Sequence, residues 1–335
     1  MTHYFFVSPS AIMHIAVIFY RNDFFWIAGL HESLLPSQYK SLANHTYSIP
    51  LPMAVDAFTC DWIPLTADQS YNICIPADLE YYKWQIPYAR FYECHFQDIV
   101  YPFKRQYKMQ QFDTEPQKQA IKEVAAAGKQ LRVPVMIIFG SLLGWYRQCN
   151  HIVESMDVDM AIMDFEYKID LFHRLFKSER LTMLKRLGTL RMGLEYRIRS
   201  PDWVWLDIFV MYQRRHNETL AYMLSQNNWI RSTYPIRKGV CSAEFLGLLV
   251  YLPCNYEEYI HAEYGTEGWF APKNGYSHRN MITEKEFESK EIIYLQHNFK
   301  TFNCSSPSDM WGCDGEPSDL IHSELYQSDL RPRNS

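Results

Sequence analysis

The sequence predicts an α+β fold, with a mainly β amino-terminal region followed by a domain that combines a mixed sheet with flanking helices. Residues 1–110 are rich in aromatic and β-branched residues and are interrupted by several prolines, which is typical of short strands joined by turns. In residues 111–300, helical periodicity alternates with short apolar runs. The last segment, 301–335, is polar and rich in Ser, Pro and Asp, so we expect a flexible tail.

The amino end predicts a hairpin. Its first apolar run, Tyr4 to Tyr20, contains Pro9 and has no basic leader before it. The residues Arg21-Asn22-Asp23 separate this run from a second one, Phe24 to Leu30. Two short apolar runs joined by a turn predict a hairpin, whereas a membrane helix needs about 20 apolar residues in succession. A membrane segment remains the alternative interpretation, although no amino-terminal anchor is evident.

The second region predicts a succession of helices and strands. An amphipathic helix at Gln117–Leu131 places its apolar residues at three- and four-residue steps and ends before Pro134. The other predicted elements are a short buried strand at Val135–Phe139, a turn at Gly140-Ser141, a helix at Leu142–Gln148, a strand at Ser155–Met163, a helix at 165–187, and two strands at Leu194–Arg199 and Val204–Tyr212. The last two form a hairpin, which brings Asp207 beside the central strands.

The strand at Ser155–Met163 carries two carboxylates one residue apart, Asp157 and Asp159. Because successive side chains of a strand point to opposite faces, both acids share one face. Two carboxylates on one face predict a site for a divalent cation. The alternative interpretation is a pair of acids exposed to water at a turn or at the edge of a strand.

A third acid, Asp207, interrupts the apolar run Trp203–Val210. Burying an unpaired charge costs on the order of 2 kcal/mol or more, so this carboxylate needs a cation or a hydrogen-bonding partner. We predict that it completes the metal site, and it is also a candidate base for an acceptor hydroxyl. The alternative is a salt bridge to an arginine such as Arg197 or Arg199.

The composition excludes some classes of function. A formal net charge of -5 gives no general attraction to nucleic acid or anionic lipid, so no nucleic-acid partner is expected and any phosphate recognition must be local. The 8 cysteines form no Cys-x-x-Cys pair, so a structural zinc site is not indicated. Their even number fits either disulfides in an oxidising compartment or buried thiols. Cys304 and Cys313 are the pair that we most readily expect to be bridged.

A Gly-Ser turn after a strand, Asp-x-Asp on the next strand and a third acid on a later strand resemble the nucleotidyltransferase superfamily, which has a polymerase-β-like fold. The resemblance implies that Gly140 lets the backbone approach a phosphate and that Ser141 hydrogen-bonds it. It also implies that the three acids hold Mg²⁺ or Mn²⁺. Ser141 can cap the following helix as well. Arg147, within that helix, is a candidate ligand of a diphosphate, with a surface arginine as the alternative.

The resemblance is closer to one family of this superfamily. Residues 139–150, followed by Asp157-Val158-Asp159, closely resemble the signature of the LicD/fukutin family. Residues 205–210 look like the third-acid strand of that family, and residues 252–260 look like its downstream motif. The resemblance extends through about residue 275, so it covers most of the chain.

The resemblance implies a metal-dependent phosphotransferase. Family members transfer ribitol 5-phosphate from CDP-ribitol to the O-mannosyl glycan of α-dystroglycan, or phosphocholine from CDP-choline. In both reactions an acceptor hydroxyl attacks phosphorus and CMP leaves. The expected partners are therefore CDP-ribitol or another CDP-alcohol, a glycan on a glycoprotein, and other Golgi transferases. The expected location is the lumenal face of the Golgi membrane.

Other functions stay open at this stage. A LicD-like enzyme would transfer phosphocholine or glycerol phosphate, a glycosyltransferase would use Asp-x-Asp to move a sugar, and a catalytically silent scaffold would bind Golgi transferases. The Gly140-Ser141 turn and the third acid argue against the glycosyltransferase. The scaffold is disfavoured because a cluster of carboxylates is costly to keep without a cation.

Overall fold

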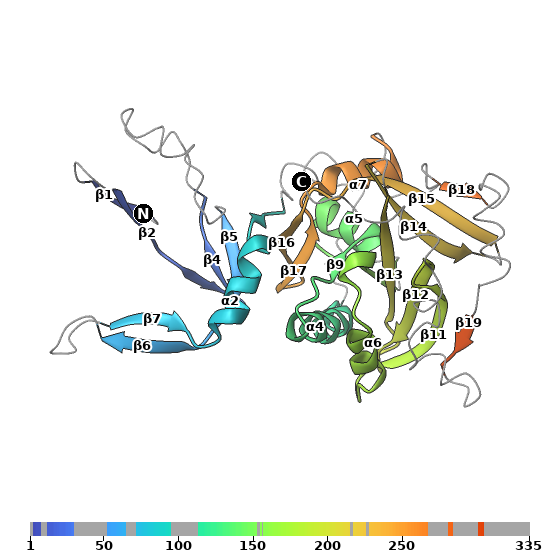
Figure 1. Cartoon of the computed structure of the whole chain (residues 1–335), viewed down its shortest axis with the longest axis horizontal. Helices are drawn as coiled ribbons and strands as arrows, with labels where there is room; N and C mark the ends of the chain where they lie inside the picture. The colour runs from blue at the N-terminus through green and yellow to red at the C-terminus, as the bar shows by residue number, and fades with distance from the viewer. Residues whose placement is uncertain are drawn as a thin grey trace, which may run out of the picture. The chain divides into compact units, whose positions relative to one another are not determined.

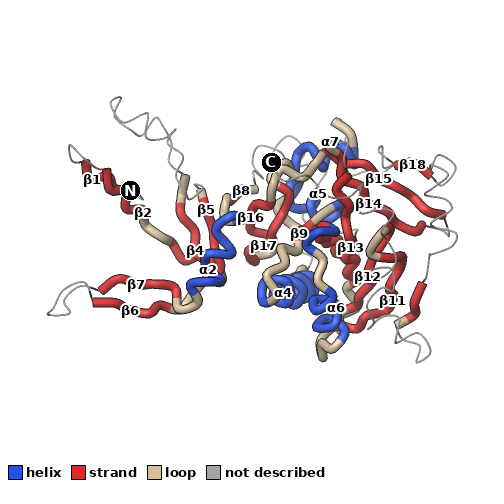
Figure 2. The backbone as a smooth tube through the Cα atoms, viewed as in Figure 1, coloured by secondary structure: helices blue, strands red, loops and turns tan. Residues whose placement is uncertain are grey.

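A computed structural model of the chain describes residues 3–7, 12–29, 52–64, 72–94, 113–152, 155, 157–214, 217–225, 228–266, 281–283 and 301–304. The chain forms two compact units (Figures 1 and 2). The first contains Met1–Glu93 together with Val240–Tyr251, and the second contains Cys94–Gly239 together with Leu252–Ser335. The sequence-based division differs, because it assigns residues 240–251 to the catalytic domain. Strand pairing with the amino-terminal region, which no local pattern reveals, accounts for the difference.

Short strands dominate the first unit. β1 pairs with β2, β3 to β5 form a three-stranded sheet, β6 pairs with β7, and β16 lies between β8 and β17. The bounds are β1 His3–Val7, β2 Ile12–Ala16, β3 Phe19–Arg21, β4 Phe24–Ile27, β5 Met53–Asp56, β6 Cys60–Pro64, β7 Asn72–Pro76, α2 Leu79–Gln85, η3 Ile86–Tyr88, β8 Phe91–Tyr92, β16 Val240–Phe245 and β17 Leu248–Pro253.

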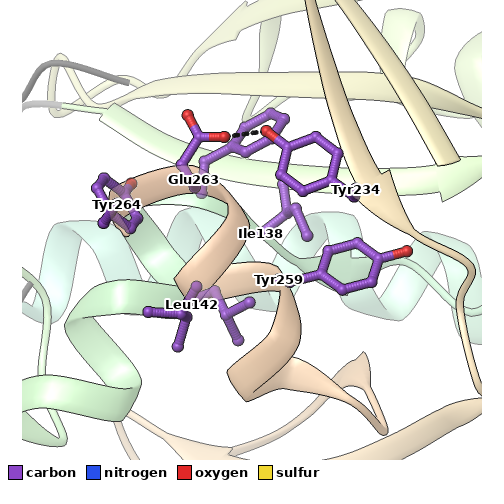
Figure 3. A pocket seen from close by; sticks show the side chains of 8 residues that line it. Ile138, Leu142, Tyr234, Tyr259, Glu263 and Tyr264 are labelled. Carbon is purple, nitrogen blue, oxygen red and sulfur yellow. Dashed lines mark hydrogen bonds between the residues drawn. The ribbon is translucent and has the colours of Figure 1, made fainter. Parts of the chain in front are cut away.

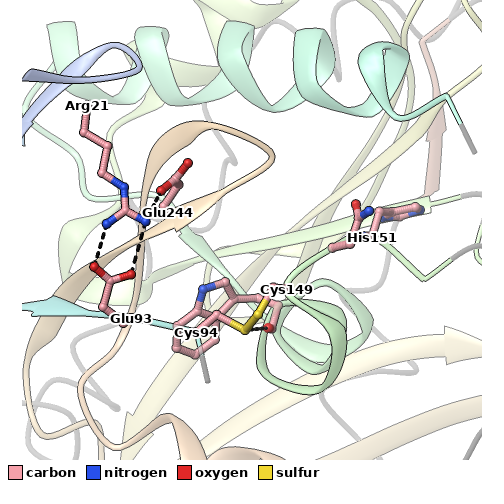
Figure 4. Close-up of a disulfide and its surroundings, with 8 residues drawn as sticks. Arg21, Glu93, Cys94, Cys149, His151 and Glu244 are labelled. Carbon is pink, nitrogen blue, oxygen red and sulfur yellow. Dashed lines mark hydrogen bonds and ion pairs between the residues drawn. A yellow bond between two sulfur atoms is a disulfide. The ribbon is translucent and has the colours of Figure 1, made fainter. Parts of the chain in front are cut away.

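The hairpin predicted at the amino end is confirmed at its turn but is shorter than predicted, because most of the first apolar run forms a hairpin of its own, β1 with β2. β3 and β4 pair across Asn22-Asp23, and Asn22 has a φ of 52°, a left-handed conformation that Asn tolerates well. Arg21, directly before this turn, forms ion pairs with Glu93 and Glu244 (Figure 4). Within the described ranges, no helix has both the length and the apolar character needed to cross a membrane.

The described cysteines are all in disulfides. Cys60 and Cys74 join β6 to β7, and Cys94 and Cys149 are bridged within the second unit. Cys304 is also disulfide-bonded, whereas Cys313, its predicted partner, lies outside the described residues. Of the two interpretations of the cysteine pattern, the structure therefore favours disulfides.

A mixed sheet forms the centre of the second unit. The order of its main path is β18-β15-β14-β13-β10-β9, and β12, β11 and β19 extend from β13. β10 runs parallel to β13, whereas β12 runs antiparallel to it. The bounds are α4 Glu115–Gln130, β9 Met136–Ile137, α5 Phe139–Gln148, β10 Asp157–Met163, η5 Asp164–Glu166, α6 Ile169–Phe176, β11 Thr182–Thr189, β12 Met192–Arg199, β13 Trp205–Arg214, β14 Glu218–Ser225, β15 Asn228–Pro235, α7 Tyr256–Tyr264, β18 Met281–Thr283 and β19 Thr301–Asn303.

The two faces of this sheet meet different helices. On one face, Tyr196 of β12 stacks on Phe172 of α6, with ring centroids 3.8 Å apart. Because neighbouring side chains alternate, Arg197 lies on the other face. On that second face, Phe139 at the start of α5 packs edge-on against Phe209 of β13, with centroids 5.0 Å apart. The start of α5 therefore lies on the face that carries the polar side chains of β12 and β13.

The predicted helix at 165–187 is wrong in its second half. α6 ends at Phe176, and Thr182–Thr189 form the strand β11. β11 pairs with β12, the next strand along the chain, and with the distant β19, so strand pairing overrides the local helical pattern. The predicted strand at Val135–Phe139 is shortened to β9, since Phe139 already begins α5. The predicted turn at Gly140-Ser141 is therefore the first turn of this helix, and Ser141 does not cap it, because the N-cap residue is Ile138. The helix at Gln117–Leu131, the strand through Asp157 and Asp159, and the hairpin of β12 and β13 are confirmed.

The α+β class is confirmed by the mixed sheet and its helices. The finer assignment, a polymerase-β-like arrangement, stays a prediction.

Candidate metal centre

Three carboxylates from two neighbouring strands meet on one face of the sheet. The parallel register of β10 and β13 places Asp159 opposite Asp207 and Asp157 opposite Trp205. One oxygen of each acid lies within 4.8 Å of the others. The structure thus brings together the three acids that the sequence singled out, and their binding of a metal stays a prediction.

The start of α5 holds Asp159. The Gly140 N–H donates to Asp159 Oδ2 over 3.0 Å, and the Asp159 N–H donates to Ser141 Oγ over 2.9 Å. A Cβ on Gly140 would lie 3.0 Å from the same Oδ2, so a glycine permits this close approach. Burial, and then the charges of Asp157 and Asp207, raise the pKa of Asp159 well above its usual value. Gly140 and Ser141 therefore orient an acid, while their contact with a phosphate stays a prediction.

The loop before β10 orients Asp157. The Ser155 hydroxyl donates to Asp157 Oδ1, and the Ser155 carbonyl oxygen lies 2.9 Å from His151 Nε2. Because a carbonyl oxygen only accepts, Nε2 carries the proton. His151 is 2% exposed, and burial lowers the pKa of its ring. A neutral histidine thus supports Asp157 through Ser155.

Asp207 forms the predicted salt bridge and also belongs to the acid cluster. Arg197 lies opposite it on β12 and donates from Nε to Oδ1 over 2.7 Å and from Nη2 to Oδ2 over 2.8 Å. Arg197 Nη2 also lies 3.4 Å from Glu195 Oε1. Burial raises the pKa of Asp207, although Arg197 opposes the shift. Burial and the charge of Asp207 raise the pKa of Glu195. The salt bridge and the acid cluster therefore coexist, and Glu195 adds a fourth carboxylate.

Sequence reasoning missed Glu195 and gave Arg197 as an alternative partner of Asp207. A signal for both was present, because Glu195, Arg197 and Arg199 alternate with apolar residues along a predicted strand. Such alternation places all three polar side chains on one face. That this face is the one carrying Asp207 follows only from the register of the hairpin.

The start of α5 carries backbone strain beside the acids. Phe139 has a φ of 47°, a conformation that is rare for a bulky residue. Its ring packs against Phe209 and Tyr234, with centroids 5.0 and 5.9 Å away. Figure 3 shows the small pocket around these groups, where the hydroxyl of Tyr234 donates to the buried Glu263. These contacts hold the backbone that presents Gly140 to the acid cluster.

The end of α5 makes contacts within the protein. Arg147 is 2% exposed and donates from Nη2 to Gln148 Oε1 over 3.0 Å, so its predicted contact with a diphosphate gains no support here and stays a prediction. Trp145 is 1% exposed. It is therefore a core residue rather than an exposed ring on which the base of a nucleotide could stack. Cys149 ends the helix with a φ of 53° and is bridged to Cys94 (Figure 4).

The side chains of the cluster fit a hard divalent cation. Mg²⁺ and Mn²⁺ prefer oxygen ligands, and Mg²⁺ usually takes only one or two carboxylates, with water and substrate phosphates in its remaining positions. A divalent charge would also relieve the repulsion among the acids that raises the pKa of Asp159. The cluster is therefore suited to such an ion in both its ligand chemistry and its charge.

Residues 132–255 match the protein-family model described as LicD/FKTN/FKRP, nucleotidyltransferase domain. This region is therefore similar to the nucleotidyltransferase domain of the LicD/fukutin family. The match includes the three acids, the Gly140-Ser141 turn and Arg197. It thus spans the whole of the candidate metal centre.

Two curated fukutin relatives show the extent of the similarity. The ribitol-5-phosphate transferase FKTN of Macaca fascicularis is 30% identical over 206 residues, which cover 60% of this chain and 44% of the relative. The human protein of the same name is 29% identical with the same coverage. An uncharacterized Caenorhabditis elegans protein is 28% identical over 173 residues, covering 47% of this chain and 44% of the relative. The LicD/fukutin similarity therefore spans less than half the length of these relatives.

Proposed function

We propose that the chain is a metal-dependent phosphotransferase that moves ribitol 5-phosphate from CDP-ribitol to a protein O-mannosyl glycan of the α-dystroglycan type. The observation that carries this proposal is the meeting of Asp157, Asp159 and Asp207 beside Gly140 and Ser141 in the first turn of α5. The matched region supports the reaction class, and the names of the fukutin relatives supply the transferred group. The glycan acceptor comes from the family resemblance.

The transfer forms one P–O bond and breaks another. The oxygen of the acceptor hydroxyl attacks the phosphorus that carries ribitol, CMP leaves, and the hydroxyl proton passes to a base, for which Asp207 is the candidate. When Mg²⁺ or Mn²⁺ is bound to the three carboxylates, its charge offsets the charge that develops on the phosphate oxygens. Gly140, Ser141 and Ser155 keep two of the acids oriented, so little reorganisation accompanies the reaction.

The proposal extends to the fold and the cellular location. A polymerase-β-like core is supported by the description of the matched family model and by acids on neighbouring parallel strands. A location in the Golgi lumen, next to other Golgi transferases, is supported by disulfides that suit an oxidising compartment.

A panel of donors tests the reaction. The purified chain is incubated with an O-mannosyl glycopeptide, Mn²⁺ and one of four donors: CDP-ribitol, CDP-glycerol, CDP-choline or a UDP-sugar. Mass spectrometry of the glycopeptide then reports the transferred group. We expect a gain of one ribitol phosphate that disappears with EDTA and returns with added Mn²⁺.

The other outcomes each contradict a different part of the proposal. A gain in mass with CDP-choline or CDP-glycerol alone would support the same reaction class and contradict ribitol phosphate as the transferred group. A gain with the UDP-sugar would show a glycosyltransferase. Binding of Mn²⁺ and CDP without transfer from any donor would support the silent scaffold.

A further inference from the structure

Oppositely charged side chains form one row across the sheet. On neighbouring strands, Lys185 of β11 lies opposite Arg197 of β12, Arg197 lies opposite Asp207 of β13, and Asp207 lies opposite Asp159 of β10. Residues directly opposite one another in a sheet share a face and interact. The acid cluster is therefore continued, on the same face, by two basic side chains.

Arg197 reaches solvent, unlike the two acids that it contacts. Its side chain is 39% exposed, whereas the side chains of Asp207 and Glu195 are 5% and 4% exposed. Its contacts with Asp207 and Glu195 use Nε and Nη2. In the part of the chain that the structure describes, Nη1 makes no hydrogen bond to the cluster, and a guanidinium carries two N–H donors on that atom. Arg197 can therefore stay hydrogen-bonded to Asp207 and still bind an anion from solvent through Nη1.

Arg197 and a divalent cation draw on the same carboxylate. Both oxygens of Asp207 accept hydrogen bonds from the guanidinium, and Asp207 is one of the three acids whose oxygens lie within 4.8 Å of one another. Two cations that share one carboxylate repel each other, because like charges a few ångströms apart interact strongly at low dielectric. In the absence of a metal, the guanidinium is thus the counterion of a buried carboxylate.

We propose that Arg197 is a phosphate-binding residue of the donor site, which neutralises Asp207 when no metal is bound and binds the donor diphosphate when the metal is bound. This inference rests on the proposed function, since it takes a nucleoside diphosphate as the ligand. Planar guanidinium groups bind phosphate oxygens through paired hydrogen bonds. Lys185, across the strand pair, adds a second positive charge beside the same position.

The test measures binding of Mn²⁺ alone, by electron paramagnetic resonance, and binding of CDP in the presence of saturating Mn²⁺, by calorimetry. The variant is Arg197→Gln, with Arg197→Lys to restore the charge without the paired donors. The control is Arg199→Gln, two residues along the same strand, whose guanidinium lies 4.3 Å from the ring centre of the exposed Trp203. Circular dichroism checks that each variant is folded.

We expect Arg197→Gln to bind Mn²⁺ alone about tenfold more tightly, because a competing positive charge is lost. We expect it to bind CDP about tenfold more weakly. Arg197→Lys restores the affinity for Mn²⁺ alone but not that for CDP, and Arg199→Gln matches the wild type in both measurements.

Weaker binding of Mn²⁺ by Arg197→Gln would overturn the inference, since it would make Arg197 a residue that only orients Asp207. Unchanged binding of CDP would overturn it as well. In both cases the proposed function survives, because the wild type binds the ion. A wild type that binds no Mn²⁺ would overturn the proposed function together with this inference.

Discussion

The two ends of β10 carry acidic residues in contrasting surroundings. At the carboxyl end, Glu166 forms paired hydrogen bonds with Arg237 at 2.7 and 2.8 Å, and Asp164 lies 3.4 Å from Arg214. Each of these acids thus has an arginine of its own. At the amino end, Asp157 and Asp159 converge with Asp207, and the guanidinium of Arg197 contacts only the last of these in the described contacts.

From this difference we infer that the acids at the carboxyl end serve the fold, and we predict that those at the amino end bind a ligand. A buried charge that is paired with an opposite charge needs no further ligand. Carboxylates that lie close together without an arginine for each repel one another, and the raised pKa of Asp159 reflects burial and then this repulsion. We therefore expect substitutions at the amino end of β10 to change binding and transfer, and substitutions at the carboxyl end to change stability.

The largest effect is expected for Asp159→Asn. Transfer from CDP-ribitol should fall by at least about 100-fold, because loss of a ligand should exceed the 10 to 100-fold effects typical of groups around a metal site. The melting temperature should not fall, since the amide removes a charge that burial disfavours. The matched control is Asp164→Asn, at the other end of the strand, which should retain transfer. Equal losses in the two variants would remove the distinction between the ends.

The second effect concerns stability. Arg237→Gln leaves Glu166 without its paired partner, and the two side chains are only 9% and 15% exposed. Denaturant unfolding should show a loss of roughly 3 kcal/mol, with Mn²⁺ binding unchanged. Lys238→Gln is the control, because its pair with Glu258 is largely exposed and should contribute less than about 1 kcal/mol. Weakened Mn²⁺ binding in Arg237→Gln would mean that the two ends of β10 are coupled.

A smaller effect is expected for Gly140→Ala. The added Cβ would lie 3.0 Å from Asp159 Oδ2, so the carboxylate must shift by a few tenths of an ångström. Mn²⁺ affinity should fall by about tenfold, as for changes beside metal ligands, while stability should change by less than about 1 kcal/mol. Calorimetric titration measures the affinity, and an unchanged value would show that the acid cluster tolerates displacement of Asp159.

The smallest effect is a pH dependence from His151. Burial lowers the pKa of this ring in the folded protein, so between that value and the ordinary one of about 6.5 the unfolded chain binds more protons than the folded one. Stability is then complete above about pH 6.5 and declines as the pH falls through the folded pKa. In His151→Gln, which keeps a donor for Ser155, melting temperatures should decline less steeply on acidification. If the melting temperature of both proteins declines equally with pH, His151 is not the cause of the pH dependence.

The three acids could be predicted from the sequence because their signal is local. Asp157 and Asp159 alternate with apolar residues, and Asp207 lies in an apolar strand. The alternation of side chains along a strand therefore gives the face on which each acid lies. Glu195 could not be placed, because its position beside Asp207 depends on the pairing of β12 with β13.

Tertiary pairing also explains the errors in the fold. β11 was predicted as helix, although its hydrogen bonds go to β12 and β19. Residues 240–251 belong with the amino-terminal unit through a strand pair that joins Ser242 to Phe91. The pairing of β11 with β12 has a local signal, because Gly188 and Gly193 flank the turn between them and both have positive φ. The pairs with β19 and between Ser242 and Phe91 join segments far apart in the chain, so periodicity could not reveal them.

A titration of the metal-free chain with Mn²⁺, followed by electron paramagnetic resonance, tests the central claim most directly. We predict saturable binding of Mn²⁺ at one site, which Asp159→Asn abolishes and Asp164→Asn retains. Absence of binding in the wild type, or undiminished binding in Asp159→Asn, would contradict a metal centre formed by Asp157, Asp159 and Asp207.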